Sequence, residues 1–240
     1  MSAAMTDDGP RYAIYFVPAA DSDLYRFGSA MLGYDCYTGD ELPHPDGVGV
    51  APDDWRRLTE EPRRYGFHAT LKAPFRLAAA HREAELARAL FDFAGASRHA
   101  TARIAPQVQL LGSFTAIVPR ETPASLSALA DGCTTAFDRF RAPMPAGERA
   151  RRTRAPLSER QLRHLDRWGY PYVFEDFRFH MTLTGPLPAE RREAVPALLR
   201  DAFARACGER AIAIDRVALF KQENEHARFR VLHHAALDGG

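Results

Sequence analysis

The residues best suited to chemistry in this chain are two histidines that stand in matching surroundings. His68 begins the tetrad His-Ala-Thr-Leu, and His180 begins the tetrad His-Met-Thr-Leu. A phenylalanine precedes each tetrad, and two residues, a proline and an apolar residue follow it. One such histidine alone is more often a satisfied structural residue than a functional one. Two copies in one repeated frame instead favour a functional pair.

The pairing of each histidine with a threonine two residues later indicates what that function is. In a β-strand, side chains alternate between faces, so His68 shares a face with Thr70, and His180 shares one with Thr182. A phosphodiester needs a base to activate the attacking oxygen and an acid to protonate the leaving oxygen. Histidine serves in both roles near neutral pH. Threonine hydroxyls can donate hydrogen bonds to the phosphate oxygens. The pattern predicts acid–base catalysis without a metal or another cofactor.

A zinc site on the same two histidines is a weaker alternative, because it needs a third ligand. The remaining candidates have no recognisable metal-ligand spacing: His164, His226, His233 and His234. The three cysteines are far apart and predict neither a zinc site nor a disulfide framework: Cys36, Cys133 and Cys207. Such sparse cysteines fit a reducing compartment.

Four other side chains are weaker candidates for substrate binding. Lys72 is predicted to lie on the strand face of the first histidine and to bind phosphate as a point charge. A solvated lysine at the end of the strand is an equal alternative. Tyr15 either belongs to the core or reaches the groove through its hydroxyl. Tyr65 and Arg178, near the starts of the two histidine strands, are weak candidates for substrate contacts.

The densest positive cluster is a run of arginines between the two halves of the chain, Arg149, Arg151, Arg152 and Arg154. A solvated loop explains it without any function. Arginine forks also match phosphate oxygens bidentately, so the run can instead be a flap that binds a second phosphate through Arg152. Arg63 and Arg64 are a second candidate for that task.

The elements that must position the histidines alternate between strands and helices. Apolar and β-branched runs predict strands over residues 11–18, 65–75, 102–111, 114–119, 179–187, 211–221 and 227–234. Helical spacing predicts helices over residues 21–32, 55–64, 78–94, 122–140, 158–168 and 189–207. The order of strand, helix, histidine strand, helix and hairpin recurs in a shorter form, which indicates an internal duplication. We therefore expect an α+β fold with two pseudo-twofold related antiparallel sheets and helices outside.

The chain is expected to form a single bilobal domain over residues 1–240. Residues 1–10 are predicted to be a disordered lead-in. The lobes are predicted to cover roughly residues 11–120 and 157–236, with a helical connection between them. The N-terminus lacks the cationic start and apolar stretch of a signal peptide. No apolar run approaches the ~20 residues of a membrane span. A cytoplasmic location without a membrane partner is the resulting prediction.

The overall charge narrows the class of partner. A formal net charge of +1, with 26% charged residues, argues against a protein that coats nucleic acid. Local arginines can still focus a field on a small anion. We therefore expect a small-molecule phosphate ester as the partner and no nucleic acid beyond short oligonucleotides. The oligomeric state stays open.

Paired His-x-Thr motifs on two strands resemble those of the two-histidine (2H) phosphoesterase superfamily, which includes cyclic phosphodiesterases and bacterial 2′,5′-RNA ligase-like proteins. Longer segments are similar to its phosphonate metabolism protein branch, found in bacterial phosphonate-utilisation operons; they are residues 11–18, 32–35, 65–75 and 179–187. The resemblance covers Tyr12 to about His234. It implies a bilobal α+β fold, no metal and a cyclic phosphate substrate. The operon context makes 5-phosphoribosyl 1,2-cyclic phosphate the natural candidate.

Two other functions stay open. The same site would suit an RNA end, such as a 2′,3′-cyclic phosphate or a 2′,5′ linkage, although the near-neutral charge speaks against long RNA. It would also suit a module that binds a nucleotide or cyclic phosphate without turnover. The motifs leave open which histidine is the acid and which ester bond breaks.

Overall fold

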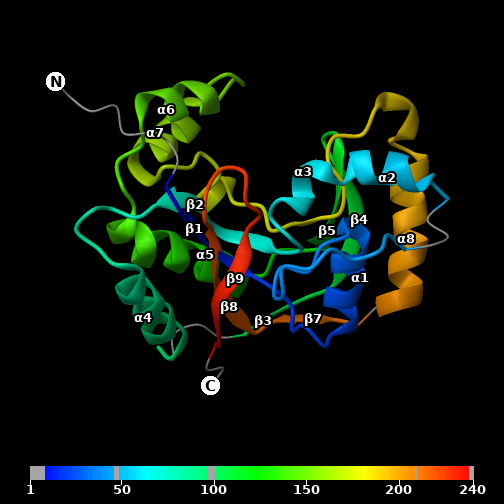
Figure 1. Cartoon of the computed structure of the whole chain (residues 1–240), viewed down its shortest axis with the longest axis horizontal. Coiled ribbons are helices and arrows are strands. Elements are labelled where there is room, and N and C mark those ends of the chain that lie inside the picture. The colour runs from blue at the N-terminus through cyan, green and yellow to red at the C-terminus, as the bar shows by residue number, and fades with distance from the viewer. Residues whose placement is uncertain (1–8, 46–48, 97–100, 209, 238–240) are drawn as a thin grey trace.

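A computed structural model describes residues 9–45, 49–96, 101–208 and 210–237, so most of the expected lead-in falls outside the described residues. A seven-stranded antiparallel sheet has the order β4-β5-β6-β2-β1-β8-β9, and β3 pairs with β7 separately (Figure 1). The strands are β1 (Arg11–Phe16), β2 (Ala69–Arg76), β3 (Ala102–Ile104), β4 (Pro106–Leu111), β5 (Phe114–Pro119), β6 (Met181–Thr182), β7 (Ile212–Ile214), β8 (Arg216–Gln222) and β9 (Arg230–Ala236).

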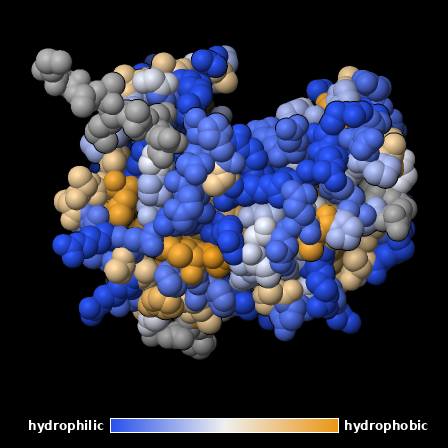
Figure 2. All heavy atoms as spheres, viewed as in Figure 1, coloured by the Kyte–Doolittle hydropathy of each residue, from blue (hydrophilic) through white to orange (hydrophobic). Residues whose placement is uncertain are grey.

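Helices pack around this sheet. They are α1 (Asp23–Leu32), α2 (Pro52–Leu58), α3 (Glu60–Arg63), α4 (Glu83–Ala94), α5 (Ala124–Phe137), α6 (Ala146–Arg152), α7 (Glu159–Trp168) and α8 (Ala194–Cys207), with 3-10 turns η1 (Asp138–Phe140), η2 (Phe174–Asp176) and η3 (Ala189–Arg191). Figure 2 shows a hollow between the part that contains α6 and α7 and the part that contains α2 and α8. The predicted α+β class, with a large antiparallel sheet and helices outside it, is confirmed.

Local sequence explains where the clearest helices begin and end. Ser22 caps α1 by accepting a hydrogen bond from the backbone N–H of Tyr25, and Ser158 caps α7 in a capping box with Gln161. Gly169 ends α7 in the left-handed conformation, with φ of 76°, which glycine adopts without strain. No helix among the described residues is long and apolar enough to cross a membrane.

The strand order exchanges hairpins between the two halves of the chain. The hairpin β4–β5, from the first half, pairs with β6, which belongs to the second histidine segment. The hairpin β8–β9, from the second half, pairs with β1 beside β2. The expected half-sheets are thus joined into one sheet, with β2 and β6 at the junction. The division into lobes at residues 11–120 and 157–236 stays a prediction.

The second histidine strand is much shorter than the predicted span of residues 179–187. The backbone N–H groups of Leu183 and Thr184 both donate to the carbonyl of Thr115, and that of Gly185 donates to the carbonyl of Leu58. These bonds take the chain out of the ladder after Thr182. Apolar residues continue through this segment, so the sequence pattern alone does not mark the end of the strand.

Candidate active site

The two histidine segments meet in the middle of the sheet. Strands β2 and β6 are antiparallel, with Ala69 opposite Met181. In this register, the residue before each partner faces the residue after the other. Each histidine therefore lies opposite the threonine of the other tetrad, and the two histidines lie on a diagonal. Opposite residues have Cβ atoms about 5 Å apart and diagonal ones lie roughly 7–8 Å apart, a spacing that admits a phosphate between the imidazoles.

The histidine and threonine side chains of the two tetrads line two cavities. Thr70 and His180 line a cavity of about 660 Å³, whereas His68 and Thr182 line one of about 240 Å³. Phe114 lines both cavities. Each cavity thus receives a histidine from one tetrad and a threonine from the other, in agreement with the strand register. That the four side chains form one catalytic site stays a prediction.

Both imidazoles are held in the same way by the backbone two residues earlier. Nδ1 of His68 lies 2.8 Å from the carbonyl oxygen of Gly66, and Nδ1 of His180 lies 2.8 Å from that of Arg178. Because a carbonyl oxygen only accepts, each Nδ1 must carry the proton. The nitrogen left to exchange protons is Nε2 in both rings, whether the ring is neutral or charged.

The surroundings of the histidines favour their neutral forms. Burial lowers the pKa of His68 to about 4, an effect that the carbonyl of Gly66 opposes and a charge on His180 reinforces. Burial also lowers the pKa of His180, although its Arg178 carbonyl partner opposes this. An anion between the rings would stabilise the imidazolium form and raise both pKa values. Binding of a phosphate would therefore favour the uptake of a proton by one of the rings.

This low pKa gives a prediction about stability and pH. The folded pKa of His68 is about 4, below the unfolded value of about 6.5, so the unfolded chain binds more protons between these values. The contribution of His68 to the free energy of unfolding should be complete above about pH 6.5 and fall as the pH drops toward 4. Urea unfolding of the wild type and His68→Gln at both pH values measures it. The variant should lose less stability on acidification, and an equal loss would contradict the prediction.

A bulge in β2 separates Lys72 from the histidine face. Tyr15 lies opposite Thr70, but its neighbour Ile14 lies opposite Lys72, so Leu71 is an extra residue in the strand. Tyr15 and Ile14 are adjacent residues that point to opposite faces of β1. Thr70 and Lys72 must therefore point to opposite faces of β2. The prediction that Lys72 shares the face of His68 is wrong, because simple alternation does not hold across a bulge.

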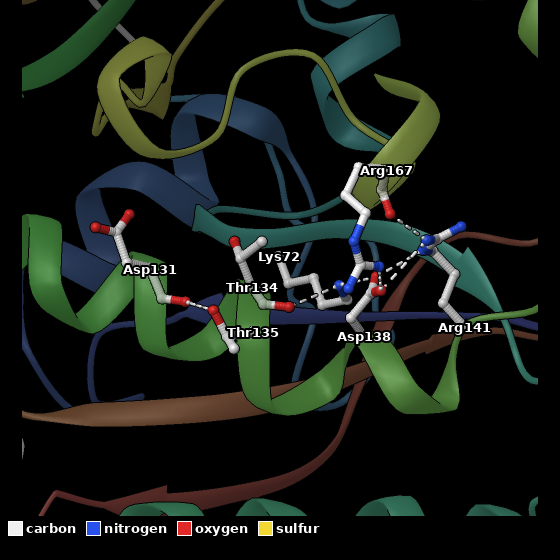
Figure 3. A network of polar contacts seen from close by, with 7 residues as sticks. All are labelled: Lys72, Asp131, Thr134, Thr135, Asp138, Arg141 and Arg167. Carbon is white, nitrogen blue, oxygen red and sulfur yellow. Dashed lines mark hydrogen bonds and ion pairs between the residues drawn. The ribbon is translucent and has the colours of Figure 1, made fainter. Parts of the chain in front are cut away.

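On the other face, Lys72 is buried in a polar network, which Figure 3 shows close by. Its Nζ lies 3.2 Å from Oδ1 of Asp138 and 3.1 Å from the carbonyl oxygen of Thr134. Arg141 and Arg167 point to the same carboxylate, at 2.8 Å and 3.2 Å. Lys72 is thus neither the phosphate ligand nor the solvated lysine that the sequence suggested. It joins β2 to the end of α5.

The other predicted binding residues are distributed around the cavities. Tyr65 lines the smaller cavity, and the exposed Arg178 lines the larger one. Arg152 pairs with Glu148 at 2.8 Å, and its guanidinium carbon lies 5.7 Å from the ring centre of Tyr170. Because Tyr170 lines the larger cavity, Arg152 contacts a residue of its lining. The roles of these side chains in binding stay predictions.

Sequence analysis missed four aromatic residues that line the larger cavity. They are Phe114, Tyr170, Tyr172 and Phe177. One of them had a usable signal, because Phe177 stands in the second repeat where Tyr65 stands in the first. The others are in loops or at a strand start outside the repeated frame, where only the folded arrangement brings them together.

No group of three or more histidine, cysteine, aspartate or glutamate side chains could hold a metal ion within the part of the chain that the structure describes. Cys36 and Cys133 are buried as free thiols, and Cys207 is a half-buried free thiol.

Sequence comparisons relate the chain to one family and to longer relatives. The family model described as "Protein of unknown function (DUF1045)" matches residues 70–230. "Ribose 1,5-bisphosphate phosphokinase PhnN" of Janthinobacterium sp. (strain Marseille) is 37% identical over 222 residues, which are 91% of this chain and 49% of that protein. The protein of the same name from Laribacter hongkongensis (strain HLHK9) is 34% identical over 92% of this chain and 50% of its own length. The chain thus spans about half the length of these curated relatives.

Solved structures give a weaker likeness. The E. coli LigT complex with 3′-AMP matches with a TM-score of 0.44 and 17% identity, over 95% of this chain and 98% of that one. The LigT complex with NADP+ matches with a TM-score of 0.42 and 17% identity, over 96% and 98%.

Proposed function

This chain belongs to the family described as "Protein of unknown function (DUF1045)", and we propose that it hydrolyses a small cyclic phosphodiester by acid–base catalysis through His68 and His180. One observation carries the proposal. The register of β2 and β6 puts two histidine–threonine pairs on one face of the sheet, in crossed positions. Two identical carbonyl anchors then leave Nε2 of both rings as the working nitrogens.

The reaction needs one proton acceptor and one proton donor on opposite sides of a phosphorus atom. Neutral Nε2 of one histidine takes a proton from water as the water oxygen bonds to phosphorus. The other histidine, charged in the presence of the phosphate, gives its Nε2 proton to the ester oxygen as the P–O bond breaks. The products are a phosphomonoester and a free hydroxyl group. The threonine hydroxyls donate to the non-bridging oxygens, where negative charge accumulates.

We favour 5-phosphoribosyl 1,2-cyclic phosphate as the substrate. Breaking its bond between phosphorus and O2 leaves a phosphate on O1 and yields ribose 1,5-bisphosphate. That compound appears in the printed name of both longer relatives, of which this chain matches about half. In this proposal the matched half supplies the substrate of the named kinase. Arg178, which lines the larger cavity, and Arg152, whose guanidinium lies over the ring of Tyr170, are our candidates for contacting the 5-phosphate.

The kinase activity in that name is a poorer fit to this chain. A P-loop needs a Gly-Lys-Ser/Thr step, in which the lysine meets the phosphates. The sequence contains only Lys72 and Lys221, and neither follows a glycine. Both are engaged in ion pairs, Lys72 with Asp138 and Lys221 with Glu83.

A second candidate substrate is a nucleoside 2′,3′-cyclic phosphate. The aromatic lining of the larger cavity favours it, because Phe114, Tyr170, Tyr172 and Phe177 offer ring faces on which a base can stack. This chemistry uses the same histidines and the same bond-breaking step.

A substrate panel assayed with and without a chelator tests the proposal. It contains 5-phosphoribosyl 1,2-cyclic phosphate, nucleoside 2′,3′-cyclic phosphates and a 2′,5′-linked dinucleotide. We expect turnover of a cyclic phosphate at the same rate with and without EDTA, with ³¹P NMR reporting which ester bond breaks. Binding without turnover of any compound would instead support a binding module. If EDTA abolished the activity and zinc restored it, the metal-independent mechanism would be wrong.

A further inference from the structure

The two tetrads differ in the residues that the neighbouring strands β1 and β5 place beside them. A strict twofold relation would make these residues the same. On the outer side of β2, Tyr15 of β1 lies opposite Thr70. On the outer side of β6, Ala116 of β5 lies opposite Thr182. These two positions correspond under the pseudo-twofold relation of the tetrads, yet one carries a large aromatic side chain and the other a methyl group. The two histidine–threonine pairs therefore differ in the residue that lies beside them on the neighbouring strand.

Tyr15 uses this position to hold His68. Its ring lies 3.8 Å from the imidazole of His68, centre to centre, with an interplanar angle of 22°. The ring is buried, with only 1% of the residue exposed. Burial raises the pKa of the Tyr15 hydroxyl well above its usual value, so it stays protonated. The ring of Tyr15 thus covers one face of His68, from the strand position opposite Thr70.

Thr70 contacts the same imidazole through its hydroxyl. Its hydroxyl oxygen lies 3.3 Å from Nε2 of His68. Since Nδ1 already donates to the carbonyl of Gly66, Nε2 of the neutral ring can only accept, and Thr70 is the donor. A donor aimed at Nε2 stabilises the unprotonated nitrogen. Neutral His68 thus has an acceptor for its Nδ1 proton and a donor at Nε2.

Among the described residues, no stacked ring covers His180 in the same way. Its ring contact is with Phe114, whose centre lies 5.7 Å away at an angle of 56°, tilted and not stacked. Ala116, at the position that corresponds to Tyr15, has no ring to cover the imidazole. The hydrogen bond from Nδ1 of His180 to the carbonyl of Arg178 is a contact that has a counterpart at His68, in its bond to Gly66.

We propose that Tyr15 is a positioning residue that fixes His68 as the proton acceptor, so that His68 is the base and His180 the acid. This inference rests on the proposed function. The titratable groups that face His68 are Tyr15 from β1, Tyr65 with its ring 6.2 Å away, and His180 from across the site. Glu61 of α3 also lines the smaller cavity, but burial dominates and keeps the pKa of His68 low.

The proton path follows from this assignment. When phosphate enters, the Thr70 hydroxyl turns to a phosphate oxygen and leaves Nε2 of His68 free for water. His68 takes the water proton as the new P–O bond forms. His180, charged beside the bound anion, gives its Nε2 proton to the leaving oxygen as the old P–O bond breaks. Solvent then removes the proton from His68 and returns one to His180.

An NMR titration of the ¹⁵N-labelled histidines tests the positioning role without requiring turnover. Tyr15→Leu removes both the stacked ring and the hydroxyl, so we expect the pKa of His68 to rise from about 4 to above about 5, with His180 nearly unchanged. Tyr15→Phe keeps the ring and should give a smaller rise in the same direction. If Tyr15→Leu does not fold, the pKa of His68 in Tyr15→Phe tests the inference by itself. Tyr12→Phe, which removes a hydroxyl bonded to Glu83, is the matched control.

Kinetics on the turned-over substrate supply the second readout. The acidic limb of the kcat/KM profile should move to higher pH in Tyr15→Leu, with kcat about tenfold lower and KM nearly unchanged. Equal movement of both histidine pKa values, or none, would overturn the inference. Absence of turnover in the wild type would count against the proposed function alone, because the titration would still report whether Tyr15 acts on His68.

Discussion

Replacement of either His68 or His180 by alanine is expected to lower kcat/KM for the cyclic phosphate by about two to four orders of magnitude. Removal of the acceptor or the donor leaves water to move that proton, and general acid–base catalysis contributes roughly 10²–10⁴-fold. Steady-state rates at several pH values measure the loss. The matched control is His226→Ala, because the side chain of His226 is 87% exposed and should not affect the rate. Thermal unfolding of each variant separates loss of chemistry from loss of fold.

The double variant makes this prediction sharper. If the two histidines act on the same phosphorus atom in one step, their effects are not independent. His68→Ala combined with His180→Ala should then cost much less than the product of the two single losses, as for other catalytic groups that act as a unit. Losses that multiply, or a single variant within threefold of the wild type, would contradict paired action.

Asp138→Ala is expected to destabilise the protein by about 3–5 kcal/mol, the usual cost of breaking a buried ion pair from one side. The change leaves the ammonium of Lys72 buried without its carboxylate, since Lys72 is only 4% exposed. It also removes the acceptor that Arg141 and Arg167 share (Figure 3). The contact between β2 and the end of α5 should weaken. Urea denaturation at neutral pH measures the free energy of unfolding.

A paired variant distinguishes the buried charge from simple loss of packing. Lys72→Met removes the charge that Asp138→Ala leaves behind, and methionine fills a similar volume. The combination Lys72→Met with Asp138→Ala should therefore be more stable than Asp138→Ala alone. If Asp138→Ala lies within about 1 kcal/mol of the wild type, or the second change restores nothing, the network does not hold the strand as described.

The histidine site was predictable because both tetrads combine a chemical signal with a periodic one. His68 and Thr70 are two residues apart, and strand alternation alone puts them on one face. The same holds for His180 and Thr182. What the repeat did not specify was the partner across the sheet. The pairing of Ala69 with Met181 depends on how two distant segments dock, and this sets each histidine opposite the other tetrad's threonine.

Lys72 and Tyr15 show why the remaining parts were less predictable. The bulge at Leu71 reverses the face of Lys72, and nothing in the apolar pattern distinguishes a bulged strand from a regular one. Tyr15 was ambiguous between core and groove, and the structure places it in the core, where its ring stacks on His68. The exchange of hairpins between halves has the same cause. Long-range strand pairing is decided by packing, which a repeat of local elements does not encode.

The central claim is that both imidazoles act on one phosphorus atom, and a crystal structure with bound inorganic phosphate tests it most directly. We expect one phosphate on the β2–β6 face, with Nε2 of His68 and Nε2 of His180 both within hydrogen-bond distance of its oxygens. Crystals of His180→Ala grown in the same phosphate serve as the control and should lose most of its occupancy. A phosphate bound by only one of the two rings, or held equally well in the variant, would contradict the account.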